Sequence, residues 1–363
     1  QQGGFHALAR AQGIGAEQVI HLVTDSKLLG RGGAAFPTGR KWDSVARAPA
    51  PRYLVCNADE SETGTFKDRI LMEGDPFAVV EAMAIAALAA GCEKGFIYIR
   101  DEYPVARRRI QNAIDQARLS GLVTVELEVR RGAGAYICGE ETALFNSIEG
   151  KRGEPRNKPP FPVEAGLFGR PTLVNNVETL VNVLDIVNGE FSDTRLFCVS
   201  GHVSRPGVYE IPLGTPLREL LEMAGVRNVQ AVLLGGAAGS FLTPEQFDVP
   251  LSFDGTRTIG ATLGSGAVMV FDDTADMKQV LLRIARFFRD ESCGQCVPCR
   301  VGTKRQEEIL ERMLSARTGD GRADVMLLSD LAQAMRDASI CGLGQTAANA
   351  IASGLTQLRV LNA

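Results

Sequence analysis

Segments typical of strands and of helices alternate over roughly the first half of this chain, and this alternation constrains its fold more than any other feature. Residues 53–58 and 95–100 are short apolar runs of strand type. Helices are predicted over residues 75–91 and 104–119, each with a proline in its first turn. With a further strand over residues 122–129, the order strand, helix, strand, helix predicts an α/β layer built on a mainly parallel sheet.

The pattern changes twice further along the chain. Residues 195–272 contain short β-runs and one helix, which predicts a small α+β module. From residue 275 onward nearly every segment is helical, apart from a loop that carries cysteines. The chain has 363 residues, and domains average roughly 150 residues. We therefore predict three domains, over residues 1–192, 193–272 and 273–363.

Composition narrows the class of protein. The chain is 45% hydrophobic and 23% charged, which excludes a disordered polypeptide. Its formal net charge of −4 argues against a dedicated nucleic-acid binder. The longest apolar run, residues 82–92, is far shorter than the ~20 residues of a membrane span, and no signal peptide is evident. We expect a cytoplasmic protein without nucleic-acid binding or direct membrane insertion. Its start at Gln1 leaves open a further domain ahead of it.

The strongest chemical signal is a run of three cysteines spaced by two residues, with a fourth farther along. Cys293, Cys296 and Cys299 suit one corner of a cube, and Cys341 supplies a remote fourth thiolate, as in a 4Fe–4S cluster. A structural zinc site is the main alternative, although zinc modules favour paired Cys-x-x-Cys or Cys/His sets, and redox-active thiols are another. The remaining cysteines lie singly in apolar runs and are expected to be core side chains: Cys56, Cys92, Cys138 and Cys198.

A glycine-rich segment near the N-terminus is a candidate for backbone that approaches a ligand closely. Gly30, Gly32 and Ala35 fit the dinucleotide pattern G-x-G-x-x-G/A, but no strand precedes them, which argues against a standard Rossmann turn. The segment leads into a helix start that carries Arg40 and Lys41, a combination suited to phosphate. A plain glycine-rich turn is the alternative interpretation.

Polar residues follow the predicted strands in two further places. An acidic cluster, residues 57–62, follows the first strand, and a second glycine loop, residues 132–139, leads to Glu140 and Glu141. The carboxyl ends of parallel strands are where α/β sheets bind ligands. A solvated helix start is the alternative for the two glutamates. The proline-rich and basic stretch over residues 151–171 is either a surface linker or an ordered loop over an anionic ligand.

Taken together, these segments resemble a known family of flavoproteins. The resemblance is carried by GRGGAAFPTGRKW, NADESETGTFKDR, GAYICGEETALFNSIEGKRGEPRNKPPFP, LVNNVETL and ESCGQCVPCRVGT with ICGLGQTA. These stretches are similar to the iron–sulfur flavoprotein that binds NADH and FMN in respiratory complex I, in NAD-reducing hydrogenases and in soluble NAD-dependent formate dehydrogenases. The resemblance implies an α/β FMN/NADH domain with an atypical Rossmann-like fold, then a ubiquitin-like β-grasp module and a C-terminal helical bundle with the iron–sulfur cluster.

Matched motif by motif, the family pattern implies three sets of ligand contacts. FMN is expected against Gly30, Arg31, Gly32, Lys41, Asn57, Asp59, Glu60, Gly139, Asn175 and Asn176. NADH is expected against Phe36, Glu62, Tyr136, Glu140, Glu141, Lys158 and Phe161. The cluster ligands are expected to be Cys293, Cys296, Cys299 and Cys341. No catalytic acid or base is assigned, because hydride passes between the stacked nicotinamide and flavin rings. Ala35 departs from the glycine that many relatives have there.

The resemblance also implies a function and partners. We expect a diaphorase subunit that exchanges hydride between NAD(H) and FMN and single electrons with the 4Fe–4S cluster. AAFPTGRKW, IRDEYP and ICGLGQTA look closer to the soluble formate dehydrogenases, with complex I and NAD-reducing hydrogenases as alternatives. The implied partners are a thioredoxin-like 2Fe–2S subunit and a larger iron–sulfur/molybdenum catalytic subunit. A non-catalytic scaffold that holds a structural cluster is the alternative of another class.

Overall fold

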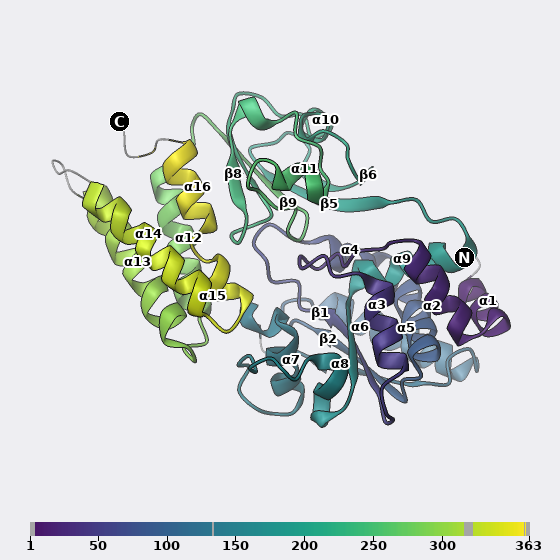
Figure 1. Ribbon diagram of the computed structural model, residues 1–363. Coiled ribbons are helices and arrows are strands. Elements are labelled where there is room, and N and C mark those ends of the chain that lie inside the picture. Colours follow the sequence, from purple (N-terminus) through teal and green to yellow (C-terminus); the bar gives the residue numbers. More distant parts are fainter. Residues whose placement is uncertain (1–3, 133, 316–321, 359, 361–363) are drawn as a thin grey trace. The chain divides into compact units, whose positions relative to one another are not determined.

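The computed structural model describes residues 4–132, 134–315, 322–358 and 360, and its contacts divide the chain into two units (Figure 1). The first unit comprises Gln1–Ser61 and Phe66–Asp193, and the second comprises Glu62–Thr65 and Thr194–Ala363. The second unit is therefore assembled from two separate stretches of sequence. The three domain boundaries inferred from the sequence stay a prediction.

The first unit is built on a four-stranded sheet in the order β3-β2-β1-β4. All neighbouring strands are parallel, which confirms the predicted α/β layer. β2 and β3 lie successively to one side of β1, whereas β4 returns to its other side, so the direction of winding reverses between β1 and β4. The strands are β1 (Tyr53–Ala58), β2 (Lys94–Ile99), β3 (Glu126–Arg131) and β4 (Thr172–Asn176).

Helix α5 (Pro76–Ala90) lies in the core of the first unit. Its start follows directly from the sequence, because the Asp75 side chain accepts from the backbone N–H of Ala78 and Pro76 occupies the first turn. Gly91 ends the helix in the left-handed region at φ 63°. The other helices of this unit are α1 (His6–Ile14), α2 (Ala16–Asp25), α3 (Thr38–Ala46), α4 (Lys67–Gly74), α6 (Pro104–Leu119), α7 (Glu141–Ile148), α8 (Pro162–Ala165) and α9 (Val177–Asn188).

Three local expectations for the first unit differ from the structure. The third strand begins at Glu126 rather than at residue 122. The sequence pattern predicts a helix over about residues 175–187, but residues 175 and 176 instead end β4. The Asn176 side chain caps α9 by accepting from the Thr179 N–H. A short buried strand that passes directly into a capped helix leaves no turn residues to separate the two. The proline-rich stretch, expected to be irregular, contains the one-turn helix α8.

The second unit contains a five-stranded sheet in the order β6-β5-β9-β7-β8. Only β5 and β9 pair in parallel, and the other neighbouring pairs are antiparallel. Its strands are β5 (Thr194–Gly201), β6 (Gly207–Pro212), β7 (Val229–Leu234), β8 (Ser240–Leu242) and β9 (Ala267–Asp272), accompanied by α10 (Leu217–Met223) and α11 (Phe253–Arg257). This mixed sheet with its short helices agrees with the small β-grasp-like module inferred from the sequence.

Beyond β9, most of the described residues of the second unit are helical, as expected. Its helices are α12 (Met277–Glu291), α13 (Val297–Ser315), α14 (Arg322–Ala338), α15 (Gly342–Thr346) and α16 (Asn349–Gln357). The backbone N–H of Phe241 in β8 donates to Ser353 Oγ of α16 at 2.9 Å, which ties the helices to the sheet of this unit. Among the described residues, no helix has the length and apolar character that crossing a bilayer would require.

Candidate functional site

The carboxyl ends of β1 and β4, where the winding of the sheet reverses, gather several of the predicted site residues. The Asn57 side chain in β1 donates to the backbone carbonyl of Gly139 at 2.8 Å. The Asn175 side chain in β4 accepts from the indole N–H of Trp42 at 2.9 Å. Residues from four segments of the sequence therefore meet at this edge, which is the position where open α/β sheets bind their ligands.

The first glycine loop lies against the end of β4. A Cβ atom on Gly32 would come within 3.2 Å of the Asn176 Cβ, so a larger residue would push these segments apart. The backbone N–H of Arg31 donates to Thr179 Oγ1 at 2.8 Å. Ala35 adopts a left-handed conformation with φ 53°, which L-residues other than glycine rarely favour. The added methyl group inferred from the sequence thus lies on a strained turn.

Arg31 itself is placed differently from a simple ligand contact. Its guanidinium group is almost fully buried and pairs with Asp193 at 2.7 Å. Only the backbone of Arg31 belongs to the part of the loop that approaches Asn176, because its side chain is engaged with Asp193.

The second glycine loop passes close to the acidic cluster that follows β1. A Cβ on Gly139 would lie 3.3 Å from Asp59 Oδ2 and 3.4 Å from the Asp59 backbone oxygen. Asp59 Oδ2 also accepts from the Ser61 hydroxyl at 2.7 Å. Glycine at position 139 therefore lets the loop backbone lie close to Asp59, where a side chain would crowd the carboxylate.

A cluster of two lysines and two glutamates lies beside these loops. Lys158 Nζ donates to Glu140 at 2.9 Å and to Glu141 at 3.1 Å, and Lys41 Nζ lies 3.8 Å from Glu141. Glu140 also caps α7 by accepting from the backbone N–H groups of Thr142 and Ala143. The two glutamates are thus paired with lysines and part of a cap, rather than a merely solvated helix start. The proline-rich stretch supplies Lys158 and is in that respect an ordered loop.

The pKa values of the two lysines are shifted in opposite directions by burial and by the neighbouring charges. Burial lowers the pKa of the Lys41 amine, with Glu141 opposing the shift and Lys158 reinforcing it. Burial also disfavours the charged form of Lys158, but Glu141 and Glu140 outweigh it and raise its pKa. Phe36 and Phe161, two of the predicted NADH contacts, are exposed, and Lys41 Nζ lies 5.7 Å from the centre of the Phe36 ring. Tyr136 is half-buried in a single 3-10 turn.

Glu60 occupies a buried position beneath this edge. Its carboxylate accepts from the backbone N–H groups of Asp68 and Arg69 at 2.8 and 3.0 Å, and from the Tyr103 hydroxyl at 3.1 Å. Burial raises the pKa of Glu60 to about 7, and the charge of Asp68 adds to the shift while Lys67 opposes it.

Behind Glu60 lies a buried ion cluster that sequence reasoning did not single out. Lys67 Nζ pairs with Asp68 at 2.8 Å and with Glu178 at 2.8 Å, and all three side chains are almost completely buried. Asp68 Oδ2 accepts from Asn176 Nδ2 at 2.6 Å. Burial lowers the pKa of the Lys67 amine, but Asp68, Glu178 and Glu60 outweigh it and raise the pKa. Lys67 and Asp68 stand inside the NADESETGTFKDR motif, which was the one available signal.

Glu62 differs from the other predicted NADH contacts because it belongs to the second unit. There its Oε1 accepts from the backbone N–H of Ala237 at 2.8 Å and from that of Thr63 at 3.0 Å. Its contact with NADH stays a prediction.

The four predicted cluster cysteines all lie in the helical part of the second unit. Cys293 and Cys296 stand between α12 and α13, Cys299 in the first turn of α13, and Cys341 immediately before α15. Cys299 is buried and the others are half-buried. Burial raises the pKa of the Cys299 thiol to about 11, opposed by a hydrogen bond with Ser292 and reinforced by the other three cysteines.

Within the described part of the chain, no three or more His, Cys, Asp or Glu side chains converge as they would around a single metal ion. A 4Fe–4S cluster makes a different demand, because each thiolate binds its own iron at a separate corner of a cube. The donor set of four thiols, three of them local and one remote, fits that ligation. The other cysteines are buried, as expected of core side chains: Cys56, Cys92, Cys138 and Cys198.

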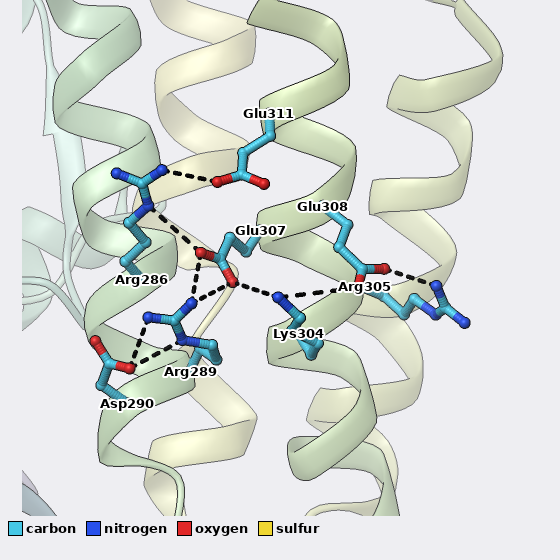
Figure 2. A network of polar contacts seen from close by, with 8 residues as sticks. All are labelled: Arg286, Arg289, Asp290, Lys304, Arg305, Glu307, Glu308 and Glu311. Carbon is cyan, nitrogen blue, oxygen red and sulfur yellow. Dashed lines mark hydrogen bonds and ion pairs between the residues drawn. The ribbon is translucent and has the colours of Figure 1, made fainter.

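An ionic network joins the two helices that flank the cysteine loop (Figure 2). Glu307 of α13 is almost fully buried and accepts from Arg289 of α12 at 2.7 and 2.8 Å. Arg286 of α12 and Lys304 of α13 approach the same carboxylate at 3.4 and 3.2 Å. This network holds α12 and α13 side by side and so fixes the two ends of the loop that carries Cys293 and Cys296.

Comparison with known proteins identifies the family. The model of the Nuo51 FMN-binding domain matches residues 23–185, the SLBB domain matches residues 196–236, and the NADH-ubiquinone oxidoreductase-F iron–sulfur binding region matches residues 279–360. The F 2 subunit of NADH-quinone oxidoreductase from Rhizobium meliloti (strain 1021) is 42% identical over 98% of this chain and 91% of its own length. The chain belongs to the family formed by the F subunits of NADH-quinone oxidoreductase.

Other relatives and a solved structure agree with this assignment. The F subunit of NADH-quinone oxidoreductase from Aquifex aeolicus (strain VF5) is 42% identical over 97% of this chain and 86% of its own length. The NADP-reducing hydrogenase subunit HndC of Solidesulfovibrio fructosivorans is 41% identical over 96% and 76%. A chain of the NAD⁺-reducing [NiFe]-hydrogenase in the H2-reduced state superposes with a TM-score of 0.92 at 39% identity. This chain is covered completely and spans 65% of that hydrogenase chain.

Membership of this family confirms several expectations. The protein is an NAD(H)-dependent flavin and iron–sulfur oxidoreductase with FMN and a 4Fe–4S cluster as its cofactors. The matched iron–sulfur region contains Cys293, Cys296, Cys299 and Cys341, which favours the cluster over the zinc and thiol alternatives. The site residues of the first unit also fit a flavin, because both glycine loops pack closely against the strand ends and the helix that follows the first loop carries the basic Lys41. The individual ligand contacts stay predictions.

Proposed function

We propose that the first unit binds FMN and NAD(H) at the carboxyl ends of β1 and β4, as the diaphorase site of a soluble NAD-dependent formate dehydrogenase. The observation that carries the site is the meeting of both glycine loops with the ends of these two strands, where the sheet changes its direction of winding. FMN, when bound, exchanges electron pairs with NAD(H) as hydride and single electrons with an iron–sulfur cluster.

The glycine loops and the strand ends would hold the flavin. Gly32 and Gly139 let the two loops approach the strand ends closely, since a Cβ at Gly32 would crowd Asn176 and one at Gly139 would crowd Asp59. Asn57 and Asn175 face this edge from β1 and β4. Lys41, beside the N-terminus of α3, supplies positive charge suited to the flavin phosphate. The remaining proposed FMN contacts are Gly30, Arg31, Asp59, Glu60 and Asn176.

The lysine–glutamate cluster would orient the nicotinamide nucleotide. Phe36 and Phe161 are exposed rings on which a base can stack. Glu140 and Glu141 are carboxylates that accept hydrogen bonds from ribose hydroxyl groups, and Lys158 holds both of them in position. Tyr136 is the remaining proposed NADH contact of the first unit, and Glu62 is not part of this site because it belongs to the second unit. The protein's contribution is to position the two rings for hydride transfer, so no side chain needs to move a proton.

The cysteine loop would carry the 4Fe–4S cluster through Cys293, Cys296, Cys299 and Cys341. Ligating thiols must be deprotonated, and burial raises the pKa of Cys299. A bound cluster would supply the positive charge that favours the Cys299 thiolate. The ionic network around Glu307 fixes α12 and α13 at either end of the loop, so the ligands keep their spacing.

The context of a formate dehydrogenase rests on AAFPTGRKW, IRDEYP and ICGLGQTA, which look closer to that branch. The partners would then be a thioredoxin-like 2Fe–2S subunit and a larger iron–sulfur/molybdenum catalytic subunit, in the cytoplasm. A hydrogenase or a complex I context is the second candidate, favoured by the names of the matched relatives. Purification of the native complex followed by metal analysis separates them, because the first requires molybdenum and a nickel–iron hydrogenase requires nickel.

The site is tested by the flavin itself. We expect the purified protein to release FMN on denaturation, and we expect NADH to bleach the flavin absorbance and to reduce ferricyanide. Lys41→Ala should weaken FMN binding about tenfold or more through loss of a charge-assisted contact. Lys151→Ala is the matched control, since Lys151 is exposed and pairs only with Glu149 among the contacts described for it. A protein that binds no flavin would contradict the proposal.

A further inference from the structure

Asp68 is the point at which three parts of the proposed flavin site are joined. Its Oδ2 accepts from Asn176 Nδ2 at 2.6 Å, at the end of β4. Its backbone N–H donates to Glu60 Oε1 at 2.8 Å, in the segment after β1. Asp68 is almost completely buried, so neither of these contacts is shared with bulk water. One residue at the start of α4 thus connects the two strand ends between which the sheet reverses.

Through Asn176, the same contact reaches the first glycine loop. Asn176 Nδ2 is directed to Asp68, while Asn176 Oδ1 accepts from the Thr179 N–H at 3.4 Å and caps α9. Both ends of the amide are therefore used, and the side chain has one orientation. A Cβ built on Gly32 would lie 3.2 Å from the Asn176 Cβ, 3.7 Å from its Cγ and 3.9 Å from its Nδ2, so the Asn176 side chain lies directly against this glycine. A shift of the Asn176 amide would therefore reach the Gly32 backbone.

Lys67 supplies the charge that Asp68 requires. Lys67 Nζ pairs with Asp68 Oδ1 at 2.8 Å, which leaves Oδ2 for Asn176. Glu178, at 2.8 Å from the same amine, holds Lys67 from the opposite direction. The ionised Asp68 carboxylate accepts from Lys67 on one oxygen and from Asn176 on the other. An asparagine at position 68 has only one oxygen, so its NH2 group would face either Lys67 or Asn176, both of which are donors.

We propose that Asp68, with Lys67 as its counter-ion, is a positioning residue for the flavin. It acts through Asn176 and Glu60 rather than by touching FMN, and it holds the first glycine loop and the two strand ends in the spacing that the flavin requires. The inference rests on the proposed FMN site.

The test compares FMN binding with stability in the full chain. Asp68→Asn keeps the shape of the side chain but removes one of two charge-assisted contacts, so the dissociation constant for FMN should rise about tenfold or more. The conservative variant Asp68→Glu keeps a carboxylate that can accept from both Lys67 and Asn176. Its FMN dissociation constant should lie within about threefold of the wild type.

Leu8→Ala is the control for a general loss of stability. Leu8 is a buried residue of α1, and its truncation destabilises the first unit without touching Asp68 or its partners. Its FMN dissociation constant should stay within about twofold of the wild type. If Asp68→Asn does not fold, Asp68→Glu decides: near-normal FMN affinity supports the proposal, and loss of FMN binding by folded Asp68→Glu protein overturns it.

The outcomes separate this inference from the function on which it rests. If the wild-type protein binds no FMN, the proposed function fails. If the wild type binds FMN and Asp68→Asn binds it equally well, the flavin site stands and the positioning role of Asp68 is wrong. The positioning role is also wrong if Leu8→Ala weakens FMN binding as much as Asp68→Asn does.

Discussion

Each unit of this protein has an ion cluster around a buried charged side chain, and the two charges are neutralised in opposite ways. In the first unit the central group is a cation, Lys67, and its partners Asp68 and Glu178 are as deeply buried as it is. In the second unit the central group is an anion, Glu307, only 3% exposed, whereas Arg286 and Lys304 around it are 48% and 49% exposed (Figure 2).

The two clusters differ in how many of their charged side chains are removed from water. A buried cluster in which no member is hydrated depends on every member, because removal of one leaves an uncompensated charge in the interior. In the cluster around Glu307 the cations keep much of their hydration, and several of them can serve the same carboxylate. The fully buried cluster around Lys67 is suited to holding one geometry around a ligand. The partly hydrated cluster around Glu307 is suited to tolerating substitution of one of its cations.

The largest effect should come from Lys67→Met, which removes the buried cation from between its acids. We expect the free energy of unfolding of the first unit to fall by about 3–5 kcal/mol. Trp42 is the chain's single tryptophan and is buried in the first unit, so its fluorescence during urea denaturation reports this loss. A decrease in the free energy of unfolding below about 1 kcal/mol would show that Asp68 and Glu178 can stay buried without Lys67. The two clusters would then not differ in the way described.

The next effect concerns pH and again belongs to the first unit. Burial raises the pKa of Glu60 to about 7 from an ordinary value of 4.5. Between these values the folded state holds the proton more tightly than the unfolded state, so stability should fall as pH rises from about 5 to 7 and then level off. The total should be about 1–3 kcal/mol, measured from urea midpoints across this range. Glu60→Gln should remove this slope, and a first unit that gains stability over the range would contradict the prediction.

Glu307→Gln should have a smaller effect, although Glu307 is as buried as Lys67. The cations that lose their carboxylate remain partly hydrated, so we expect a loss of about 1–2 kcal/mol. Hydrogen exchange of the amides in α12 and α13 measures it locally. A loss equal to that of Lys67→Met would mean that burial of the central group alone decides the outcome.

Lys304→Met should have the smallest effect and is the direct counterpart of Lys67→Met. Lys304 is half-exposed, and Arg289 still donates to Glu307 when it is removed. We expect a change below about 1 kcal/mol in the same exchange measurement, and a further decrease of that change in high salt. A change above about 2 kcal/mol would place the second cluster in the same class as the first.

The sequence predicted the sheet of the first unit better than the polar interior behind it. Residues 53–58 were predicted as a strand and form β1 with the same bounds, because an apolar run between turn residues has few other solutions. The convergence of Asn57 with the second glycine loop was also accessible, since parallel strands end at one edge. β4 was missed because its two asparagines have the character of a helix start.

The ion cluster could not be predicted in the same way. A lysine and an aspartate in the first turn of a helix are typical of a solvated surface, and nothing local distinguishes Lys67 and Asp68 from that case. Their burial depends on a partner that follows much later, since Asn176 lies 108 residues beyond Asp68. The position of Glu62 in the second unit has the same origin, in a contact with Ala237 that only the tertiary structure creates.

The short segment Glu62–Thr65 imposes an order on biosynthesis. The residue that pairs with Glu62, Ala237, leaves the ribosome 175 residues later. At about 5–20 residues per second, the segment waits roughly 10–35 seconds for its partner. During this interval the remainder of the first unit is synthesised, while the segment Glu62–Thr65 still lacks its contacts with the second unit. A fragment that begins at Thr194 would never receive that piece, so the second unit is complete only as part of the whole chain.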